Sequence, residues 1–328
     1  MHLRIATFNL ENLDDDGDLA TGFPERARVL RRQLARLDAD ILCLQEVHGQ
    51  RVELPGGGYR RELRALRRLL EGTPFADYHL AGTRQADLDS ALDVHNLAIL
   101  SRLPLVRVRQ VWHQHVPPLA YAPRTAEPPV PDYQVRWERP ILAAAVDLPG
   151  GRSLHVLNVH LRAPVASFVR GQKLDAATWR STAGWAEGYF LAALKRDGQA
   201  LEARLEVEHL LNANPRALIA LCGDCNAEAR ETALRIMRAA PHLVGTGDLA
   251  ARALHVCDET VPLDRRFSIR HDGRPILLDH ILASSALFEA HAKTEIHNED
   301  LLDDVRDATA PPVGSFHAPI VVEFRFDG

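Results

Sequence analysis

The chain has few cysteines, no long apolar run and no recognisable leader segment, and each absence excludes a class of protein. Four cysteines in 328 residues are too few for a disulfide scaffold, and we expect them to be reduced. No apolar stretch approaches the roughly 18 residues of a membrane-spanning helix, and residues 2–8 resemble a strand rather than a signal peptide. We therefore expect a soluble, cytoplasmic protein with no membrane partner.

The chain also lacks an excess of basic residues. Its 39 Lys and Arg residues against 44 Asp and Glu residues give a formal net charge of -5, so there is no global positive field to attract nucleic acid. Residues 59–71 predict a helix that gathers Arg60, Arg64, Arg67 and Arg68, but charge on an amphipathic helix is typical of a solvated outer face. Binding to nucleic acid would require a local basic groove.

What the sequence does contain is an alternation of strand and helix patterns. Residues 3–8 predict a strand, apolar residues from Ala27 to Leu37 at helical spacing predict a helix, and the apolar run at 41–47 is typical of a strand buried on both faces. This order indicates layered α/β structure. Because no linker or repeat is evident, we predict a single domain spanning residues 1–328.

Strands dominate the later part of the chain. Residues 116–132 are rich in proline, which cannot donate to a strand ladder, so they predict a surface loop that is either a lid or a long connection. Pro149–Gly151 predicts the turn of a hairpin between strands at 141–148 and 152–161. Further strands are expected near 76–80, 97–101, 105–112, 217–224, 275–284 and 319–326, with a mostly helical stretch ending near residue 212.

The segment ALIALCGDCNAE, residues 217–228, raises a choice between two pairs of residues. Along a strand, Asp224 and Asn226 point to the same side, whereas Cys225 faces the other side and diverges from Cys222. A redox Cys-x-x-Cys motif normally opens a helix, and a zinc site would need further ligands that are not seen. We therefore favour Asp224 and Asn226 as the functional pair.

Other apolar runs also end in polar residues that are suited to chemistry. A single polar residue at a strand end is typical of a turn, but together these residues form a coherent set. Carboxylates suit Mg²⁺ or Mn²⁺, amides orient ligands, and histidines exchange protons near neutral pH. The set comprises Asn9, Glu11, Gln45, Glu46, Asn158, His160, Asp224, Asn226, Asp279, His280 and His317.

Six segments in order carry a resemblance to a known family: TFNLEN, LQE, NVHL, GDCN, LDHIL and SFHAP. The chain resembles the endonuclease/exonuclease/phosphatase superfamily, whose fold is similar to that of deoxyribonuclease I. The resemblance implies an α/β fold, a four-layer sandwich of two facing mixed β-sheets flanked by helices, with the site at one end. It also implies hydrolysis of a phosphate ester with one or two divalent ions, Mg²⁺ or Mn²⁺.

The resemblance implies a role for each motif residue. Glu46 would hold the metal with Asn9 beside it, and the ion would stabilise charge on the phosphoryl oxygens. Asp224 would position or deprotonate the attacking water, and Asn226 would hold the phosphate. His160 would bind the phosphate or assist the leaving oxygen.

The remaining motif residues complete this picture. His317 would be the essential histidine, oriented by Asp279. Arg139, Asn96 and Asn158 stand where related enzymes place substrate-binding residues. The alternatives for Arg139 and Asn96 are a surface arginine and a turn asparagine.

One position departs from the family pattern. The usual motif before the last strand is Ser-Asp-His, but here Phe316 replaces the carboxylate. This departure allows three interpretations: a site that binds a single metal ion, a metal site rebuilt from a neighbouring acid, or a weakened or inactive enzyme. The acids that precede Phe316 and could replace the carboxylate are Asp300, Asp303, Asp304 and Asp307. We expect a phosphodiesterase or phosphatase acting on a small phosphate ester. The alternatives are a nuclease and an inactive relative that binds phosphorylated ligands or proteins.

Overall fold

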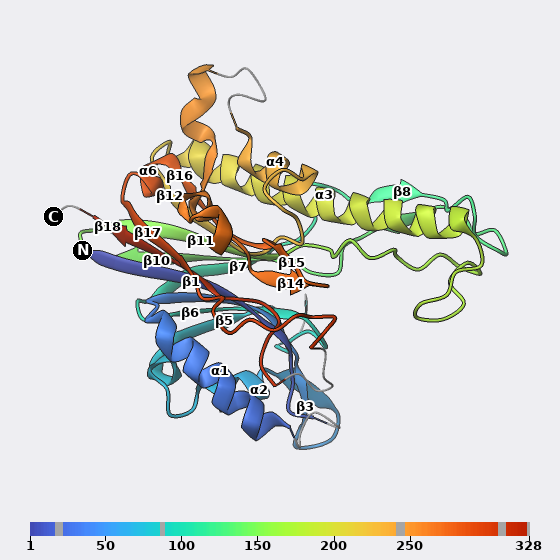
Figure 1. The fold of residues 1–328 in the computed structure, drawn as a ribbon, viewed down its shortest axis with the longest axis horizontal. Coiled ribbons are helices and arrows are strands. Elements are labelled where there is room, and N and C mark those ends of the chain that lie inside the picture. The colour runs from blue at the N-terminus through green and yellow to red at the C-terminus, as the bar shows by residue number, and fades with distance from the viewer. Residues whose placement is uncertain (17–21, 86–88, 241–246, 308–312, 327–328) are drawn as a thin grey trace.

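The computed structural model describes residues 1–16, 22–85, 89–240, 247–307 and 313–326. Its frame is a pair of six-stranded mixed sheets that face each other, with helices on both outer faces (Figure 1). The fold predicted from the family resemblance, a four-layer α/β sandwich, is confirmed. Within the described residues, no helix combines the length and the apolar character needed to cross a membrane.

The first sheet has the strand order β17-β18-β1-β2-β6-β5. Its strands are β17 (His291–Ile296), β18 (Ile320–Arg325), β1 (His2–Leu13), β2 (Ile41–Val47), β6 (Asn96–Ser101) and β5 (His79–Gly82). β1 runs parallel to β2 and antiparallel to β18. The pairing of β1 with β2 loses its register between Asn9 and Leu13, where β1 bulges next to the candidate site.

The second sheet has the strand order β13-β16-β12-β11-β10-β7. Its strands are β13 (Leu254–Val256), β16 (Asp279–Ser284), β12 (Leu218–Asp224), β11 (Arg152–His160), β10 (Ile141–Leu148) and β7 (Leu105–Val111). The hairpin predicted at Pro149–Gly151 joins β10 to β11, and both turn glycines have positive φ angles. β11 and β12 are parallel, so their carboxyl ends share one edge.

Three apolar layers explain why the four layers hold together. One core lies between the sheets, a second packs α1 (Phe23–Leu37) and α2 (Arg64–Leu70) on the first sheet, and a third packs α3 (Thr182–Ala213) and α4 (Thr232–Arg238) on the second. Each fully buried leucine in these cores stabilises the fold by about 1.5–3 kcal/mol. Cys222 lies in the core between the sheets and Cys225 in the outer core, so the two thiols diverge as expected.

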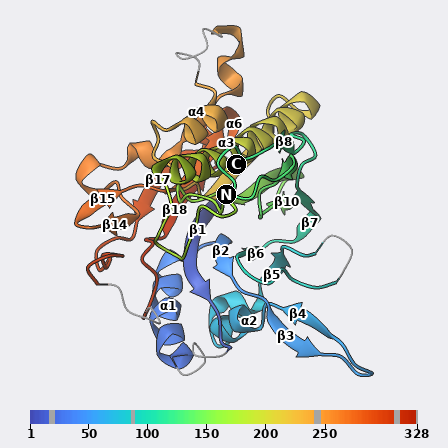
Figure 2. The same cartoon turned by 90° about the vertical axis from the view of Figure 1, so that its right-hand side faces the viewer.

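The prediction of one helix over residues 59–71 is wrong for its first part. Residues Tyr59–Glu62 form β4, which pairs antiparallel with β3 (Gln50–Glu53), and the two extend away from the sheets (Figure 2). Pairing with β3 supplies backbone hydrogen-bond partners that outweigh the local helical pattern. Arg60 therefore lies on a strand, whereas Arg64 and Arg68 lie on α2 and form ion pairs with Asp15.

The first half of α3 extends past the ends of the sheets (Figure 1). The proline-rich loop lies beside it and contains β8 (Leu119–Tyr121), which pairs with β9 (Tyr133–Val135). A small apolar cluster joins these elements to Leu191 of α3. The remaining elements are β14 (Ile269–His271), β15 (Arg274–Ile276), α6 (Ser285–Phe288) and short 3-10 turns at Pro74–Asp77, Gly247–Arg252, Cys257–Thr260 and Leu263–Arg265.

Candidate active site

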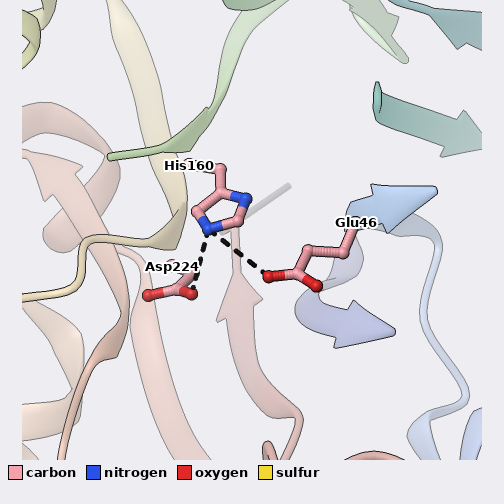
Figure 3. A group of neighbouring side chains, drawn as sticks. All are labelled: Glu46, His160 and Asp224. Atoms are coloured by element: carbon pink, nitrogen blue, oxygen red, sulfur yellow. Dashed lines mark ion pairs between the residues drawn. The ribbon is translucent and has the colours of Figure 1, made fainter. Parts of the chain in front are cut away.

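The carboxyl ends of four strands bring the motif residues together. β1 and β2 are parallel in one sheet, and β11 and β12 are parallel in the other, so the residues that end each pair lie at the same edge. Glu46 comes from β2, His160 from β11 and Asp224 from β12, and their side chains point toward one another (Figure 3). The candidate site therefore spans the boundary between the two sheets.

Glu46, His160 and Asp224 form the first group of potential metal ligands. Nε2 of His160 lies 3.4 Å from Oδ2 of Asp224 and 3.7 Å from Oε1 of Glu46. The buried amide of Asn9 donates to the same two oxygens, at 3.2 Å for Glu46 and 3.0 Å for Asp224. Asn9 thus ties a carboxylate of one sheet to a carboxylate of the other.

Asp224, Asp279 and His317 form a second group that shares Asp224 with the first. Nδ1 of His317 lies 2.7 Å from Oδ2 of Asp279. Burial disfavours the His317 imidazolium, but the Asp279 carboxylate outweighs this effect and raises the pKa of His317 well above its usual range. The ring is therefore held as a cation, with Nδ1–H directed to Asp279.

The backbone before His317 is also fixed. The Ser315 hydroxyl accepts from the His317 amide at 3.0 Å and donates to the carbonyl of Asn9 at 2.7 Å. The segment that precedes β18 is thereby attached to the end of β1, which also carries a site residue. His317 consequently keeps its place relative to Asn9.

Asp224 has the most perturbed carboxyl group of the site. Burial and the neighbouring Asp279 carboxylate raise its pKa from 3.8 to about 7. The Asn226 amide N–H donates to Oδ1 of Asp224 at 2.8 Å and orients it. Gly223 is required before it, because a Cβ there would lie 1.9 Å from the carbonyl oxygen of Val159 and its φ is 147°.

His160 has a defined tautomer. Nη1 of Arg139 lies 2.5 Å from Nδ1 of His160, and since a guanidinium only donates, Nδ1 must accept. The ring proton then lies on Nε2, which faces Asp224. Burial and the Arg139 cation lower the pKa of His160 well below its usual range, so His160 is a neutral hydrogen-bond donor.

The residues present fit a divalent metal ion. Each group contains two carboxylates whose oxygens lie within 4.8 Å of one another, and such hard oxygen donors suit Mg²⁺ or Mn²⁺. Oδ1 of Asp279 is buried without a hydrogen-bond partner, and the raised pKa of Asp224 marks an excess of buried negative charge. Glu46 and Asp224 are the residues that would hold an ion.

The structure gathers eight of the ten sequence-predicted site residues at this edge: Asn9, Glu46, Arg139, His160, Asp224, Asn226, Asp279 and His317.

Asn158 and Asn96 are different, because their buried amides are hydrogen-bonded to framework groups instead of to the metal-ligand groups. The Asn158 amide accepts from Gln45 at 2.8 Å and donates to the carbonyls of Leu44 and Ala98 in the opposite sheet. The Asn96 amide is similarly engaged, accepting from the Leu92 N–H at 2.8 Å. We attribute a framework role to both residues.

Two residues at the site were missed by the sequence analysis. Arg26 of α1 is buried and donates to backbone carbonyls of β1, and Gln199 of α3 donates to the carbonyls of Arg139 and His160 at 3.3 and 3.4 Å. A signal existed for Arg26, because it lies on the apolar stripe of its helix, four residues before Leu30. Gln199 gave no comparable signal.

Two facing mixed sheets with these acids and histidines at one end define the class of proteins with a deoxyribonuclease I-like fold. The chain belongs to the Endonuclease/Exonuclease/phosphatase family, because the sequence model of that family matches residues 6–307. Members of this family are hydrolases that act on phosphate esters. No curated protein matches the chain.

Several solved structures share the fold. A mannosyl-6-phosphatase from Bacteroides thetaiotaomicron is 18% identical with a TM-score of 0.58, and the match covers 99% of this chain and 100% of the other. Truncated TDP2 from Caenorhabditis elegans is 15% identical, with a TM-score of 0.54 and coverage of 98% and 97%. An AP endonuclease from Archaeoglobus fulgidus is 17% identical, with a TM-score of 0.52 and coverage of 99% and 100%.

Proposed function

We propose that the chain is a divalent-metal-dependent phosphoesterase, either a phosphodiesterase or a phosphatase, that hydrolyses a small phosphate ester. The observation that carries this proposal is the shared position of Asp224. It lies beside Glu46, with which it could hold a metal ion, and beside Asp279 and His317, which are suited to proton transfer. Water attack on a phosphate ester needs both functions in one place.

Different residues of the chain would carry out the separate steps of hydrolysis. Asp224, whose Oδ1 is oriented by the Asn226 N–H, would orient the attacking water and accept its proton. His160 donates from Nε2 to a phosphoryl oxygen, with Arg139 behind it. His317 presents Nε2 on the side away from Asp279, where it can donate to the phosphate or to the leaving oxygen. A bound Mg²⁺ or Mn²⁺ would supply Lewis-acid stabilisation of the phosphoryl charge.

The preference for a small ester over nucleic acid rests on charge. The net charge is -5, and three of the four arginines that were candidates for a phosphate-binding stripe, Arg60, Arg64 and Arg68, have acidic partners. Arg64 pairs with Asp15 and Asp16, and Arg68 pairs with Asp15. Side chains neutralised in this way add little attraction for a polyanion.

The first test is hydrolysis of nitrophenyl phosphate monoesters and diesters by metal-stripped protein, with and without added Mg²⁺ or Mn²⁺. We expect metal-dependent turnover that falls about 10²- to 10⁴-fold in His317→Ala, because a group active in proton transfer contributes in this range. His79→Ala, an exposed histidine on β5, is the matched control and should keep native turnover. Near-native turnover of His317→Ala would contradict the assignment.

Supercoiled plasmid separates the proposal from its alternatives. Asp224→Ala serves as the blank for contaminating nuclease. Metal-dependent nicking that disappears in this variant would make the protein a nuclease, against the preference for a small ester. If plasmid, monoesters and diesters all stay intact, that result would favour the alternative of an inactive relative.

A further inference from the structure

The part of the molecule that projects past the ends of the sheets carries exposed apolar side chains (Figure 1). This projecting arm comprises residues 117–135 and 162–191, and its second segment follows closely after His160 of the candidate active site. Phe168 is 66% exposed and Trp185 is 48% exposed. The exposed large apolar residues of the second segment are Val165, Phe168, Leu174, Trp185, Tyr189 and Phe190. Such a concentration on one part of a surface marks a binding site for a protein or a membrane.

The backbone of the arm holds these side chains close together. The Ser167 N–H donates to the carbonyl of Gly188 at 2.8 Å. This bond attaches the loop that carries Phe168 to the turn of α3 that carries Trp185 and Tyr189. A Cβ at position 188 would lie 2.5 Å from the carbonyl oxygen of Ser167, so only glycine permits this close approach.

The arm has a small apolar cluster of its own, and the exposed side chains lie outside it. The buried members of this cluster are Ala126, Val135, Val169 and Leu191. Its residues pack the two segments of the arm against each other and leave the outer side chains in contact with solvent. Burial of the outer side chains would therefore require a surface that the arm does not supply.

The cations of the arm are mostly free of acidic partners. Arg180 pairs with Glu127 at 2.9 Å. Within the part of the chain that the structure describes, the other four cations of the arm form no ion pair; they are Arg124, Arg162, Arg170 and Lys173. Unpaired cations next to apolar side chains favour a partner that is both anionic and apolar.

The acids of the arm, in contrast, are mostly engaged within it. Glu187 accepts hydrogen bonds from the first segment, and Glu127 pairs with Arg180. Asp175 accepts from backbone N–H groups of its own turn, and Asp132 is the fourth acid. The arm therefore presents positive charge on a chain whose net charge is -5.

We propose that the projecting arm docks onto the surface of a lipid bilayer that contains anionic lipids. The aromatic and aliphatic side chains enter the interface, and the cations lie beside the lipid phosphates. Docking of this kind needs no membrane-spanning helix. The proposal departs from the expectation of no membrane partner, which was drawn from the lack of a long apolar run. It concerns a partner and does not depend on the reaction proposed above.

The kinds of side chain distinguish a bilayer from nucleic acid and from a second copy of the chain. Val165 and Leu174 have no ring that could stack on a base, and the rings of Trp185 and Tyr189 already stack on each other with centroids 5.4 Å apart. In a symmetric dimer, the unpaired cations of one arm would face the same cations of the other, and like charges repel.

The test is cosedimentation of the native protein with vesicles of equal parts phosphatidylcholine and phosphatidylserine. We expect binding that is about tenfold weaker with phosphatidylcholine alone, because the cations lose their partners. The double variant Phe168→Ser/Trp185→Ser should weaken binding by about tenfold or more. Leu263→Ser is the matched control, because Leu263 is 81% exposed but lies outside the arm, and it should bind as the native protein does.

The double variant should keep a melting temperature close to the native value, since both side chains are largely in contact with solvent. Absence of vesicle binding by the native protein overturns the proposal, as does equal binding by a folded double variant. Binding of single-stranded oligothymidylate without binding of vesicles would also overturn it and assign the arm to nucleic acid. A dimer in analytical ultracentrifugation that dissociates in the double variant, again without vesicle binding, would overturn it in favour of a second copy.

Discussion

Arg26 is a buried cation whose hydrogen bonds go to backbone carbonyls, and Arg31 of the same helix bonds carbonyls of α2 in the same way. We predict that Arg26→Met weakens Mn²⁺ binding by about tenfold, because residues 9–12 lose their support. Arg31→Met should leave binding unchanged. Both variants should lower the free energy of unfolding by roughly 1–3 kcal/mol, since carbonyls lose donors.

Metal titration and urea unfolding of the two variants check this prediction. Equal metal affinities in Arg26→Met and Arg31→Met would reduce Arg26 to a structural residue. A lysine in place of Arg26 offers one donor group where the guanidinium reaches three carbonyls, so Arg26→Lys should restore binding only in part.

The pH dependence of stability follows from Asp224. Its pKa is raised from 3.8 to about 7, so the folded state binds this proton more tightly than the unfolded state does. The contribution of Asp224 to the free energy of unfolding of metal-free protein should therefore fall as the pH rises from about 4 to about 7. His317, whose pKa is also raised, continues the fall at higher pH.

Urea unfolding at a series of pH values, in chelator and in Mn²⁺, measures this dependence. Asp224→Asn should remove the fall below pH 7. Bound metal should reverse its sign, because a cation favours the ionised carboxylate. Parallel pH profiles for the native protein and Asp224→Asn in chelator would contradict the assignment of Asp224.

The sequence predicted those site residues that lie at the ends of strands. Glu46, His160 and Asp224 end apolar runs, and the ends of parallel strands in one sheet must meet. Arg26 and Gln199 act on the site from helices, and although the position of Arg26 on an apolar stripe was a signal, only the tertiary fold reveals the contacts of either residue. The local sequence pattern at Asn158 could not show that its side-chain amide donates hydrogen bonds to carbonyls of the opposite sheet.

At the scale of elements, α3 connects the site to the projecting segment beside β8. Gln199 donates to the carbonyls of Arg139 and His160 and accepts from the Arg162 N–H at 2.8 Å. We predict that Gln199→Ala lowers kcat/KM by about tenfold through misplacement of Arg139 and His160. Metal affinity should not change, because Glu46 lies on another element.

Gln172 provides a matched control for this prediction. It is also buried and also bonds a backbone carbonyl, that of Thr125 at 2.6 Å, but in the projecting part of the molecule. Gln172→Ala should lower stability without lowering kcat/KM. Equal losses of activity in both variants would mean that α3 acts only on the fold.

The accuracy of the element predictions also has a physical explanation. The β10–β11 hairpin was predicted because Pro149–Gly151 marks a turn locally in the sequence, and the two glycines do adopt positive φ angles. Residues 59–62 were assigned to a helix because helical spacing continues through them, whereas the pairing with β3 that makes them a strand is not encoded in that spacing. Pairing between strands that are distant in the sequence cannot be predicted from the periodicity of either strand.

For the whole molecule, alternation of strand and helix patterns indicated α/β layers, but the facing of two sheets came from the family resemblance. The arrangement matters because Glu46 belongs to one sheet and Asp224 to the other. Asn9 ties the two carboxylates together. The site exists only while the sheets face each other.

A metal ion held by residues of both sheets binds the folded protein and not the unfolded chain. By mass action, a free Mn²⁺ concentration 100 times the dissociation constant should add about 2.7 kcal/mol to the free energy of unfolding. The melting temperature should therefore rise with metal concentration in the native protein and stay constant in Glu46→Gln. The ion would stabilise the packing of one sheet against the other. The metal concentration would therefore affect the fraction of folded protein as well as the fraction of active protein.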